Sequence, residues 1–332
     1  MASEVTPVME GGGRISWPDV STSIIIAAHN EGERLLWTVE SVREVALIFR
    51  MEIIVADDAS SDGSIAELQR LFEEVRVVGN RERLGPSPTK DLGARSSQGE
   101  ILIFLDGHTK PEDGALFRLV ERVKEARGQA IFTPRVLQLD AETWTNKPAG
   151  VGLGHRMALP TFDCGWMGSK ELRHRGPYYE SPSLCGCAFA ISRDLYDELC
   201  GFDPGMREWG LEDLDLGLKS WLADHPVLVD PLAAVGHLFR EKFSYQVSVE
   251  HVLANKMRTA RKNFTDRSFD DWCRVLREQY REETWALAGS IYRSREESVE
   301  RERESLLARR VHDEFWYARR FDLGWPVGEG DS

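Results

Sequence analysis

The chain lacks a long hydrophobic run. It contains 332 residues, and none of its apolar stretches approaches the roughly 20 residues that a membrane-spanning helix needs. The N-terminal segment MASEVTPVMEGGGRISWPDV has no basic region followed by an apolar core, so it does not resemble a secretory signal peptide. We therefore expect no membrane span, and a flexible leader over residues 1–20.

Cysteine is scarce as well. The five cysteines, at positions 164, 185, 187, 200 and 273, show neither the paired CxxC spacing of zinc sites nor the density of disulfide-stabilised secreted domains. We interpret them as reduced thiols and expect a cytoplasmic protein. The CxC triplet at 185–187 is typical of neither a redox motif nor a metal motif without further cysteines nearby, and we interpret it as buried strand packing.

The chain has fewer basic than acidic residues. Lys and Arg number 42 against 55 Asp and Glu, which gives a net charge of −13. Such a surface disfavours nucleic acid and anionic membranes, because both attract basic proteins. A cationic small molecule or peptide would be attracted instead.

What the sequence does contain is an alternation of strand and helix patterns over its first 110 residues. TSIIIAA (22–28), EIIVADD (52–58), VRVVGN (75–80) and ILIFLD (101–106) are typical of buried parallel strands, and the segments between them show helical periodicity. This alternation predicts an α/β fold with a mostly parallel, Rossmann-like sheet flanked by helices. Ligands of such sheets bind beyond the carboxyl ends of the strands, where the polar segments AAHN, DDASSD and DGH lie.

Later segments extend this pattern and then depart from it. We expect a strand at 129–137, a strand leading into a helix at 185–199, a helix at 212–224 and a strand at 226–239. The stretch 144–182 is rich in Gly, Pro and aromatic residues. After about residue 246 the composition becomes charged and helical, which predicts a main domain over 21–250 and a helical C-terminal extension over 251–332.

A candidate metal site lies at the end of the fourth strand. Asp106 and His108 are two residues apart, so an extended chain points both side chains the same way. A carboxylate with an imidazole suits a divalent cation of the Mn²⁺ type. His237 ends another apolar run, and Arg240 follows it as a candidate phosphate ligand. The simpler alternative is a strand that ends in a solvated turn, with a structural histidine elsewhere.

A second candidate site is acidic. WGLEDLDLGLKSWL places Glu212 and Asp213 in the first turn of a predicted helix, where acidic residues also stabilise the helix N-terminus. The preceding Trp209 favours a pocket in which one carboxylate orients a sugar and the other deprotonates a hydroxyl. In DDASSDGS, Asp58 could accept a hydrogen bond from a base such as uracil, although Asp and Ser are also good helix caps.

Six segments, in this order, resemble nucleotide-sugar glycosyltransferases of the GT-A fold: IIIAAHNEGERL, IIVADDASSDGS, LGPSPTKDLGARSSQGEILIFLDGH, GCAFAISRDLYDELCGFDPGM, WGLEDLDLGLKSW and VGHLFREKFSY. The first half resembles the large family 2 glycosyltransferases. The second half resembles the catalytic domain of the polypeptide N-acetylgalactosaminyltransferases, which carry an Asp-x-His metal motif, a Trp-Gly-Gly-Glu-Asn helix start and GHVFR. The resemblance covers roughly residues 22–265 and identifies 21–250 as a GT-A glycosyltransferase domain.

The resemblance implies a metal and a diphosphate site. Asp106, His108 and His237 would ligate Mn²⁺, or Mg²⁺ in its place. Arg240 would contact the pyrophosphate of a UDP-sugar. Lys90 stands near the nucleotide diphosphate, where the family usually has an arginine, so the charge is kept but the forked geometry is not.

The resemblance also implies contacts to the rest of the nucleotide. Asp58 would contact uracil, and His29 and Glu31 would lie on the loop near the nucleotide. Trp209 would pack over the site. Tyr245 matches the tyrosine of the loop that closes over the donor.

Two residues depart from the family pattern. Cys187 replaces the second glycine of a Gly-Gly pair, where the backbone approaches the sugar, so the sugar stays open. Glu212 would hold sugar hydroxyls, but Asp213 replaces the family's asparagine and creates the Glu-Asp pair of inverting transferases, in which the aspartate is the general base. The overall resemblance favours retention and this local chemistry favours inversion. We lean toward inversion.

Together these features predict a metal-dependent glycosyltransferase. It would move a hexose or N-acetylhexosamine from a UDP-sugar to a hydroxyl or thiol of a peptide or small natural-product acceptor. One alternative is a nucleotidyltransferase, which would carry a Gly-rich basic loop after its first strand, where AAHNEGERL lacks the glycines. Another is a non-catalytic nucleotide-sugar-binding module, which would need neither a base nor a metal. The sequence leaves the acceptor, the oligomeric state and the role of the extension open.

Overall fold

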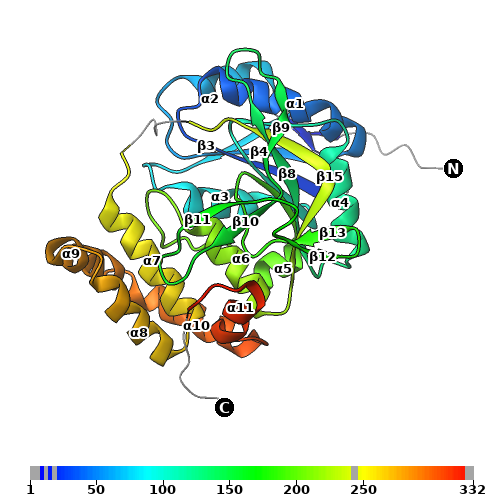
Figure 1. Cartoon of the computed structure of the whole chain (residues 1–332). Helices are drawn as coiled ribbons and strands as arrows, with labels where there is room; N and C mark the ends of the chain where they lie inside the picture. The colour runs from blue at the N-terminus through cyan, green and yellow to red at the C-terminus, as the bar shows by residue number, and fades with distance from the viewer. Residues whose placement is uncertain (1–7, 11–13, 17–20, 241–245, 326–332) are drawn as a thin grey trace.

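The N-terminal part of the sheet is a parallel unit built as the alternation predicts (Figure 1). The computed structural model describes residues 8–10, 14–16, 21–240 and 246–325. Its first elements are β3 (Thr22–Ala28), α1 (Glu33–Phe49), β4 (Glu52–Asp57), α2 (Ser64–Leu71), β5 (Arg76–Gly79), α3 (Pro86–Ser96) and β6 (Ile101–Asp106). The four strands lie in the order β6-β3-β4-β5, all parallel. Their carboxyl ends therefore meet at one edge.

Both faces of this unit are buried, which explains its β-branched runs. Ile24 and Ile26 pack with Leu35 of α1 and Leu68 of α2 on one face, whereas Ile25 packs on the opposite face. On that opposite face α3 contacts β3 and β4. Alternate residues of one strand thus supply two separate cores.

The sheet continues beyond β6 as a mixed one. Its further elements are β7 (Thr109–Pro111), α4 (Ala115–Glu125), β8 (Ile131–Leu139), β14 (Ala188–Ser192), α5 (Arg193–Glu198), α6 (Glu212–Leu222) and β15 (Val227–His237). β14 runs antiparallel to both β6 and β8, and β15 runs parallel to β8. The mostly parallel sheet predicted from the sequence thus holds for the first unit, and the α/β fold flanked by helices is confirmed.

The stretch 144–182 forms strands that its Gly- and Pro-rich composition did not predict. They are β9 (Asn146–Gly152), β10 (Gly154–Met157), β11 (Cys164–Met167), β12 (Arg173–Arg175) and β13 (Tyr178–Glu180). β9 pairs with β8, β10 pairs with β11, and β12 and β13 extend the main sheet beside β15. This stretch is a set of short hairpins.

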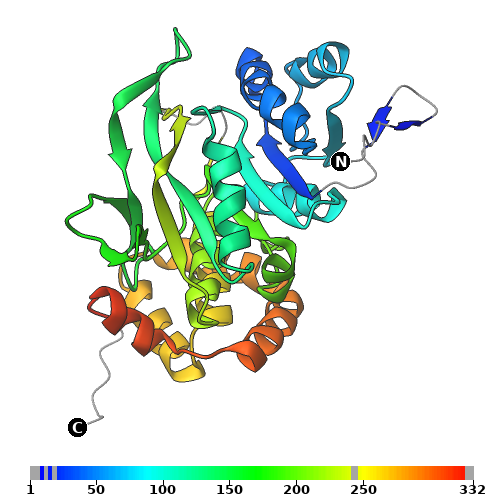
Figure 2. The same cartoon turned by 90° about the vertical axis from the view of Figure 1, so that its right-hand side faces the viewer.

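The C-terminal helices pack against the lower part of the domain, on the side of α6 (Figure 2). They are α7 (Val249–Asn263), α8 (Asp266–Arg277), α9 (Glu282–Arg293), α10 (Glu296–Arg309) and α11 (Glu314–Phe321). Trp272 and Tyr317 of these helices are fully buried in the same core as Ile25. The predicted helical extension is therefore present and shares a core with the sheet.

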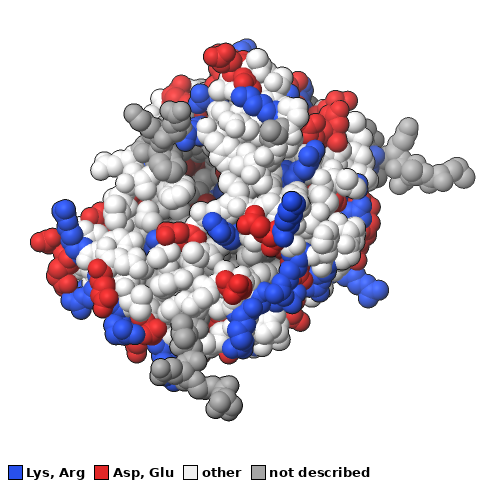
Figure 3. Space-filling view, viewed as in Figure 1, with Lys and Arg blue, Asp and Glu red and all other residues white. Residues whose placement is uncertain are grey.

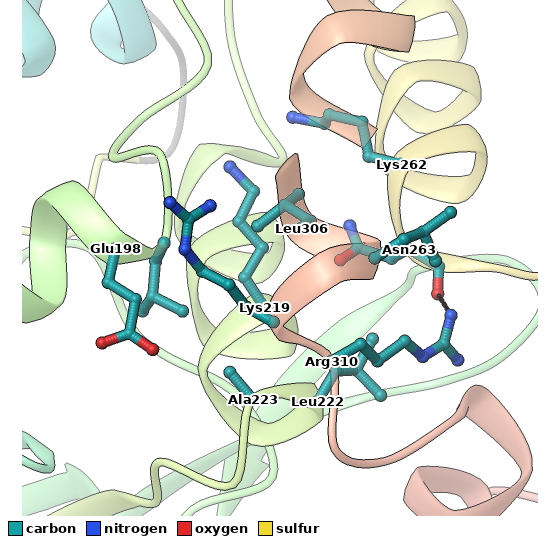
Figure 4. Close-up of a pocket in the computed structure, with 11 residues that line it drawn as sticks. Glu198, Lys219, Leu222, Ala223, Lys262, Asn263, Leu306 and Arg310 are labelled. Atoms are coloured by element: carbon teal, nitrogen blue, oxygen red, sulfur yellow. Dashed lines mark hydrogen bonds between the residues drawn. The ribbon is translucent and has the colours of Figure 1, made fainter. Parts of the chain in front are cut away.

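A buried ionic network links these helices to α6. Asp203 accepts from Arg258 at 2.7 Å and from Lys262 at 2.8 Å, and Lys262 also donates to Asp215 at 2.8 Å. The cavity beside it is lined by Lys219 and Lys262 (Figure 4), but these lysines are paired with Asp203, Asp215 and Glu302. We therefore interpret this cavity as structural.

Within the leader expected at 1–20, β1 (Val8–Glu10) and β2 (Arg14–Ser16) pair as antiparallel strands, which the flexible-leader prediction did not include.

Over the described ranges, every helix is too short or too polar to cross a lipid bilayer.

Candidate active site

Lys90 lies where the end of β6, the start of α6 and the turn before β14 meet. Its Nζ donates to the Gly186 carbonyl oxygen at 3.0 Å and lies 3.2 Å from Asp106 Oδ1 and 3.3 Å from Glu212 Oε1. Burial opposes its charge, but Asp106, Glu212 and Asp213 raise the pKa of Lys90, so it stays an ammonium. The structure thus places Lys90 beneath the site, 2% exposed, with its three N–H groups directed at these three oxygens. Its predicted place near the nucleotide diphosphate stays a prediction.

The predicted metal ligands come together. One ligand atom each from Asp106, His108 and His237 lies within 4.8 Å of the others, and His237 Nε2 is 3.5 Å from Asp106 Oδ2. Burial raises the pKa of Asp106, but the charge of Lys90 and the bond from His237 outweigh it and hold that pKa well below its usual range. Burial lowers the pKa of His237, which keeps the ring neutral and able to coordinate.

Glu31 supports this cluster through its contact with His108. Its Oε1 lies 3.2 Å from His108 Nδ1, and its other oxygen pairs with Arg240. Burial opposes the charge of Glu31, but His108 and Arg240 lower its pKa. A carboxylate on one ring nitrogen of a histidine is the usual support of a metal ligand, and it leaves Nε2 of His108 for the metal. Sequence reasoning placed Glu31 near the nucleotide and missed this contact.

The donor set fits a divalent cation. Ligand atoms at about 2.1 Å from an octahedral ion lie about 3–4.2 Å apart, so a cluster within 4.8 Å needs only a small adjustment. His237 Nδ1 is buried and, among the described residues, has no hydrogen-bond partner. One carboxylate and two imidazoles suit Mn²⁺ better than Mg²⁺, which prefers oxygen ligands.

Asp58 anchors the loop that precedes α3. Its carboxylate accepts from the backbone N–H groups of Leu84 and Gly85 at 2.8 and 2.7 Å, and from Asn80 Nδ2 at 2.9 Å. His29 Nδ1 lies 2.7 Å from the Asp58 carbonyl oxygen. The side chain of Asp58 is therefore held by the protein's own N–H groups, a role that its sequence position did not indicate.

The two carboxylates in the first turn of α6 lie in different environments. Asp213 is half-buried and accepts from Gly186 N–H and from Leu214 N–H, both at 2.9 Å. Glu212 is 7% exposed, and burial with the nearby charge of Asp213 raises its pKa to about 7, although Lys90 opposes this. At neutral pH, Glu212 can therefore hold a proton.

Gly186 is a site residue that sequence reasoning missed. Its N–H holds Asp213 and its carbonyl oxygen accepts from Lys90. A Cβ there would lie 2.9 Å from Asp213 Cβ and 3.1 Å from Lys90 Nζ, so only glycine fits. Its place in the Gly-Gly position of the family was the available signal. Cys187 beside it is buried, and its carbonyl oxygen accepts from Asp106 N–H at 3.1 Å.

Trp209 lies shortly before α6 and is 38% exposed, and its predicted packing over the site stays a prediction. The preceding Glu208 accepts from Ser248 N–H at 2.7 Å and lies 3.1 Å from His251 Nδ1, so it fixes the start of α7 to the Trp209 loop. Tyr245 lies outside the described residues. Acidic and basic side chains are mixed over the face in Figure 3, so the net charge is not concentrated there.

The chain is similar in sequence to known glycosyltransferases. A family model described as glycosyl transferase family 2 matches residues 23–200. The chain is 32% identical over 261 residues to human polypeptide N-acetylgalactosaminyltransferase 3, covering 73% of this chain and 41% of that protein. It is 34% identical over 241 residues to mouse polypeptide N-acetylgalactosaminyltransferase 6, covering 68% and 38% respectively. The chain thus spans about two fifths of these relatives' length.

Two solved structures share the fold. The structure of GalNAc-T7 with UDP, GalNAc and Mn²⁺ gives a TM-score of 0.70 at 22% identity, covering 93% of this chain and 57% of that one. S. aureus TarS residues 1–349 in complex with UDP-GlcNAc gives a TM-score of 0.50 at 14% identity, covering 87% and 91%. At these identities the likeness shows the architecture of the domain.

Proposed function

We propose, because the chain belongs to glycosyl transferase family 2, that it transfers a hexose or N-acetylhexosamine from a UDP-sugar to an acceptor with the help of a divalent cation. The observation that carries this proposal is the cluster of Asp106, His108 and His237 at the strand ends, joined through Lys90 to Glu212. The relatives named as N-acetylgalactosaminyltransferases and the GalNAc-T7 structure with UDP, GalNAc and Mn²⁺ support the same donor class.

Different residues would bind different parts of the UDP-sugar donor. Asp106, His108 and His237 would hold Mn²⁺, which, when bound, supplies positive charge for the leaving diphosphate. Arg240, fixed by Glu31, adds a second positive charge on the same side. Asp58 holds the 80–85 loop with its carboxylate, which already accepts three hydrogen bonds, and one further lone pair would accept from uracil.

Lys90 acts through its neighbours. Its ammonium group keeps Asp106 ionised, which a metal ligand requires, and it fixes Glu212 for the sugar hydroxyls. Because Glu212 can be protonated near neutral pH, it can donate a hydrogen bond to a sugar oxygen as well as accept one.

We propose Asp213 as the general base, which predicts inversion. It is the more exposed of the two carboxylates, and two backbone N–H groups orient it. Its oxygen would take the proton of the acceptor's hydroxyl or thiol as the bond to the anomeric carbon forms. The anomeric configuration of the product, read from proton NMR couplings, tests this: the same configuration as the donor would assign Asp213 to binding.

For the acceptor, we propose a peptide side chain, which the relatives' names favour over a small natural product. The five free cysteines fit a reducing compartment such as the cytoplasm.

The proposal is tested by a thermal-shift screen of UDP, GDP, TDP, CMP and their sugars, each with and without Mn²⁺. A specific ligand raises the melting temperature by mass action on the native state. We expect a Mn²⁺-dependent shift with UDP compounds, retained in the surface control Asp140→Asn and lost in His237→Ala. UDP release from the preferred UDP-sugar then establishes turnover. A shift with another nucleotide would correct the donor, and no shift with any nucleotide would refute the transferase.

A further inference from the structure

Two cysteine sulfurs lie in contact next to the site. Cys185 Sγ and Cys187 Sγ are 3.5 Å apart, on either side of Gly186. Cys185 is partly exposed and Cys187 is 5% exposed, and both are free thiols. The spacing of the sequence indicated only buried packing, but the structure brings the two thiols close enough to react with each other.

The triplet 185–187 also holds the site through its backbone. Gly186 N–H donates to Asp213, the Gly186 carbonyl accepts from Lys90, and the Cys187 carbonyl accepts from Asp106 N–H. Each of these partners has a role in the proposed function. The position of one short backbone segment therefore sets the base, the central ammonium group and a metal ligand together.

We propose that Cys185 and Cys187 are a modification site, at which oxidation to a disulfide switches the transferase off. The proposal rests on the proposed function for its effect on turnover. The sulfurs must approach from 3.5 Å to about 2.05 Å, the length of a disulfide bond. Only Gly186 lies between the two residues, so its backbone must take up the movement, and glycine has the torsional freedom for it.

That movement cannot leave the site intact. Gly186 is already packed so closely that a Cβ would lie 2.9 Å from Asp213 Cβ and 3.1 Å from Lys90 Nζ. Movement toward these two residues is therefore blocked, and movement away breaks their hydrogen bonds with Gly186. Misplacement of reacting groups by about 1 Å can cost about a hundredfold in rate.

The chemistry balances with a hydroperoxide as the oxidant. Cys185, the more accessible of the two, loses its thiol proton, and its thiolate attacks one peroxide oxygen and breaks the O–O bond. The sulfur becomes a sulfenic acid, and the hydroxide that leaves takes up a proton in place of the one lost and becomes water. The Cys187 sulfur then attacks the Cys185 sulfur and displaces hydroxide, which leaves with the Cys187 thiol proton as a second water. The two sulfurs lose two electrons, the peroxide gains them, and a thiol reductant reverses the reaction through exchange.

The test treats the full chain with hydrogen peroxide and measures three quantities: peptide masses for the disulfide, UDP release, and amide hydrogen exchange of Gly186. We expect a Cys185–Cys187 disulfide, a loss of about a hundredfold in turnover that dithiothreitol restores, and faster exchange at Gly186. Cys185→Ala and Cys187→Ala, each compared with its own untreated activity, should be insensitive. The matched control Cys164→Ser, which removes the exposed cysteine, should stay sensitive.

The outcomes separate the inference from the proposed function. A reduced protein that binds no UDP and releases none refutes the proposed function, whereas the peptide masses and the exchange rate still decide whether the dithiol closes and moves Gly186. Absence of the 185–187 disulfide, a bridge to Cys164 instead, or a disulfide that leaves turnover and exchange unchanged would each overturn the inference.

Discussion

Removing the ammonium group of Lys90 should destabilise the protein strongly. Lys90→Met leaves Asp106 and Glu212 without their shared counter-charge, and their side chains are only 24% and 8% exposed. Breaking a buried ion pair by removing one partner costs about 3–5 kcal/mol, because the remaining charge stays desolvated. We therefore expect the free energy of unfolding of the metal-free protein to fall by about 3–5 kcal/mol, measured by urea denaturation with EDTA present.

A control and a second variant make this prediction specific. Arg70→Met removes a cation whose side chain is 66% exposed beside Glu67, itself 44% exposed, so its loss should leave the free energy of unfolding near that of wild type. Adding Asp106→Asn to Lys90→Met removes the stranded carboxylate and should recover about 1–3 kcal/mol. A Lys90→Met protein within about 1 kcal/mol of wild type, or strictly additive effects in the pair, would refute the central role of this lysine.

Three further predictions concern other parts of the structure. The metal-free protein should lose stability as the pH rises from 4.5 to about 7, because native Glu212 keeps a proton that the unfolded chain releases, and urea denaturation across this range should show a flatter profile for Glu212→Gln. Asp203→Asn should lower the free energy of unfolding by about 3–5 kcal/mol, since it leaves the buried Arg258 without its carboxylate partner, whereas the 78%-exposed Asp266→Asn should cost less than about 1 kcal/mol. Gly186→Ala should lower kcat about a hundredfold in steady-state kinetics, whereas Gly165→Ala, whose Cβ would meet only a flexible arginine, should leave kcat near wild type. Equal effects of Asp203→Asn and Asp266→Asn on stability, or of Gly186→Ala and Gly165→Ala on kcat, would contradict these predictions.

Local sequence signals predicted the first half of the fold well. Strands β3 and β6 begin and end where the apolar runs do, because strands buried on both faces read as continuous β-branched segments. The direction of β14 could not be predicted in this way. Its AFAIS segment has the same apolar pattern whether it runs parallel or antiparallel, and the pairing depends on distant contacts with β6 and β8.

The sequence predicted those residues of the candidate site whose spacing along the chain brings their side chains together. Asp106 ends β6 and His108 lies in the short turn before β7, so the two side chains are close because they are near in the chain, and the fold brings them to His237. Lys90 and Gly186 were harder to place. The burial of Lys90 beneath the carboxylates and the use of Gly186's backbone by Asp213 are tertiary contacts between α3, α6 and the turn before β14, which leave no periodic signal.

The claim that the histidines and the nucleotide share one metal ion is tested most directly by pulsed electron paramagnetic resonance of Mn²⁺ bound to the protein with UDP. We predict nitrogen couplings from two imidazoles together with phosphorus couplings from the diphosphate. The nitrogen couplings should weaken in His237→Ala. Phosphorus couplings without any from nitrogen would place the ion on the nucleotide alone and contradict the account.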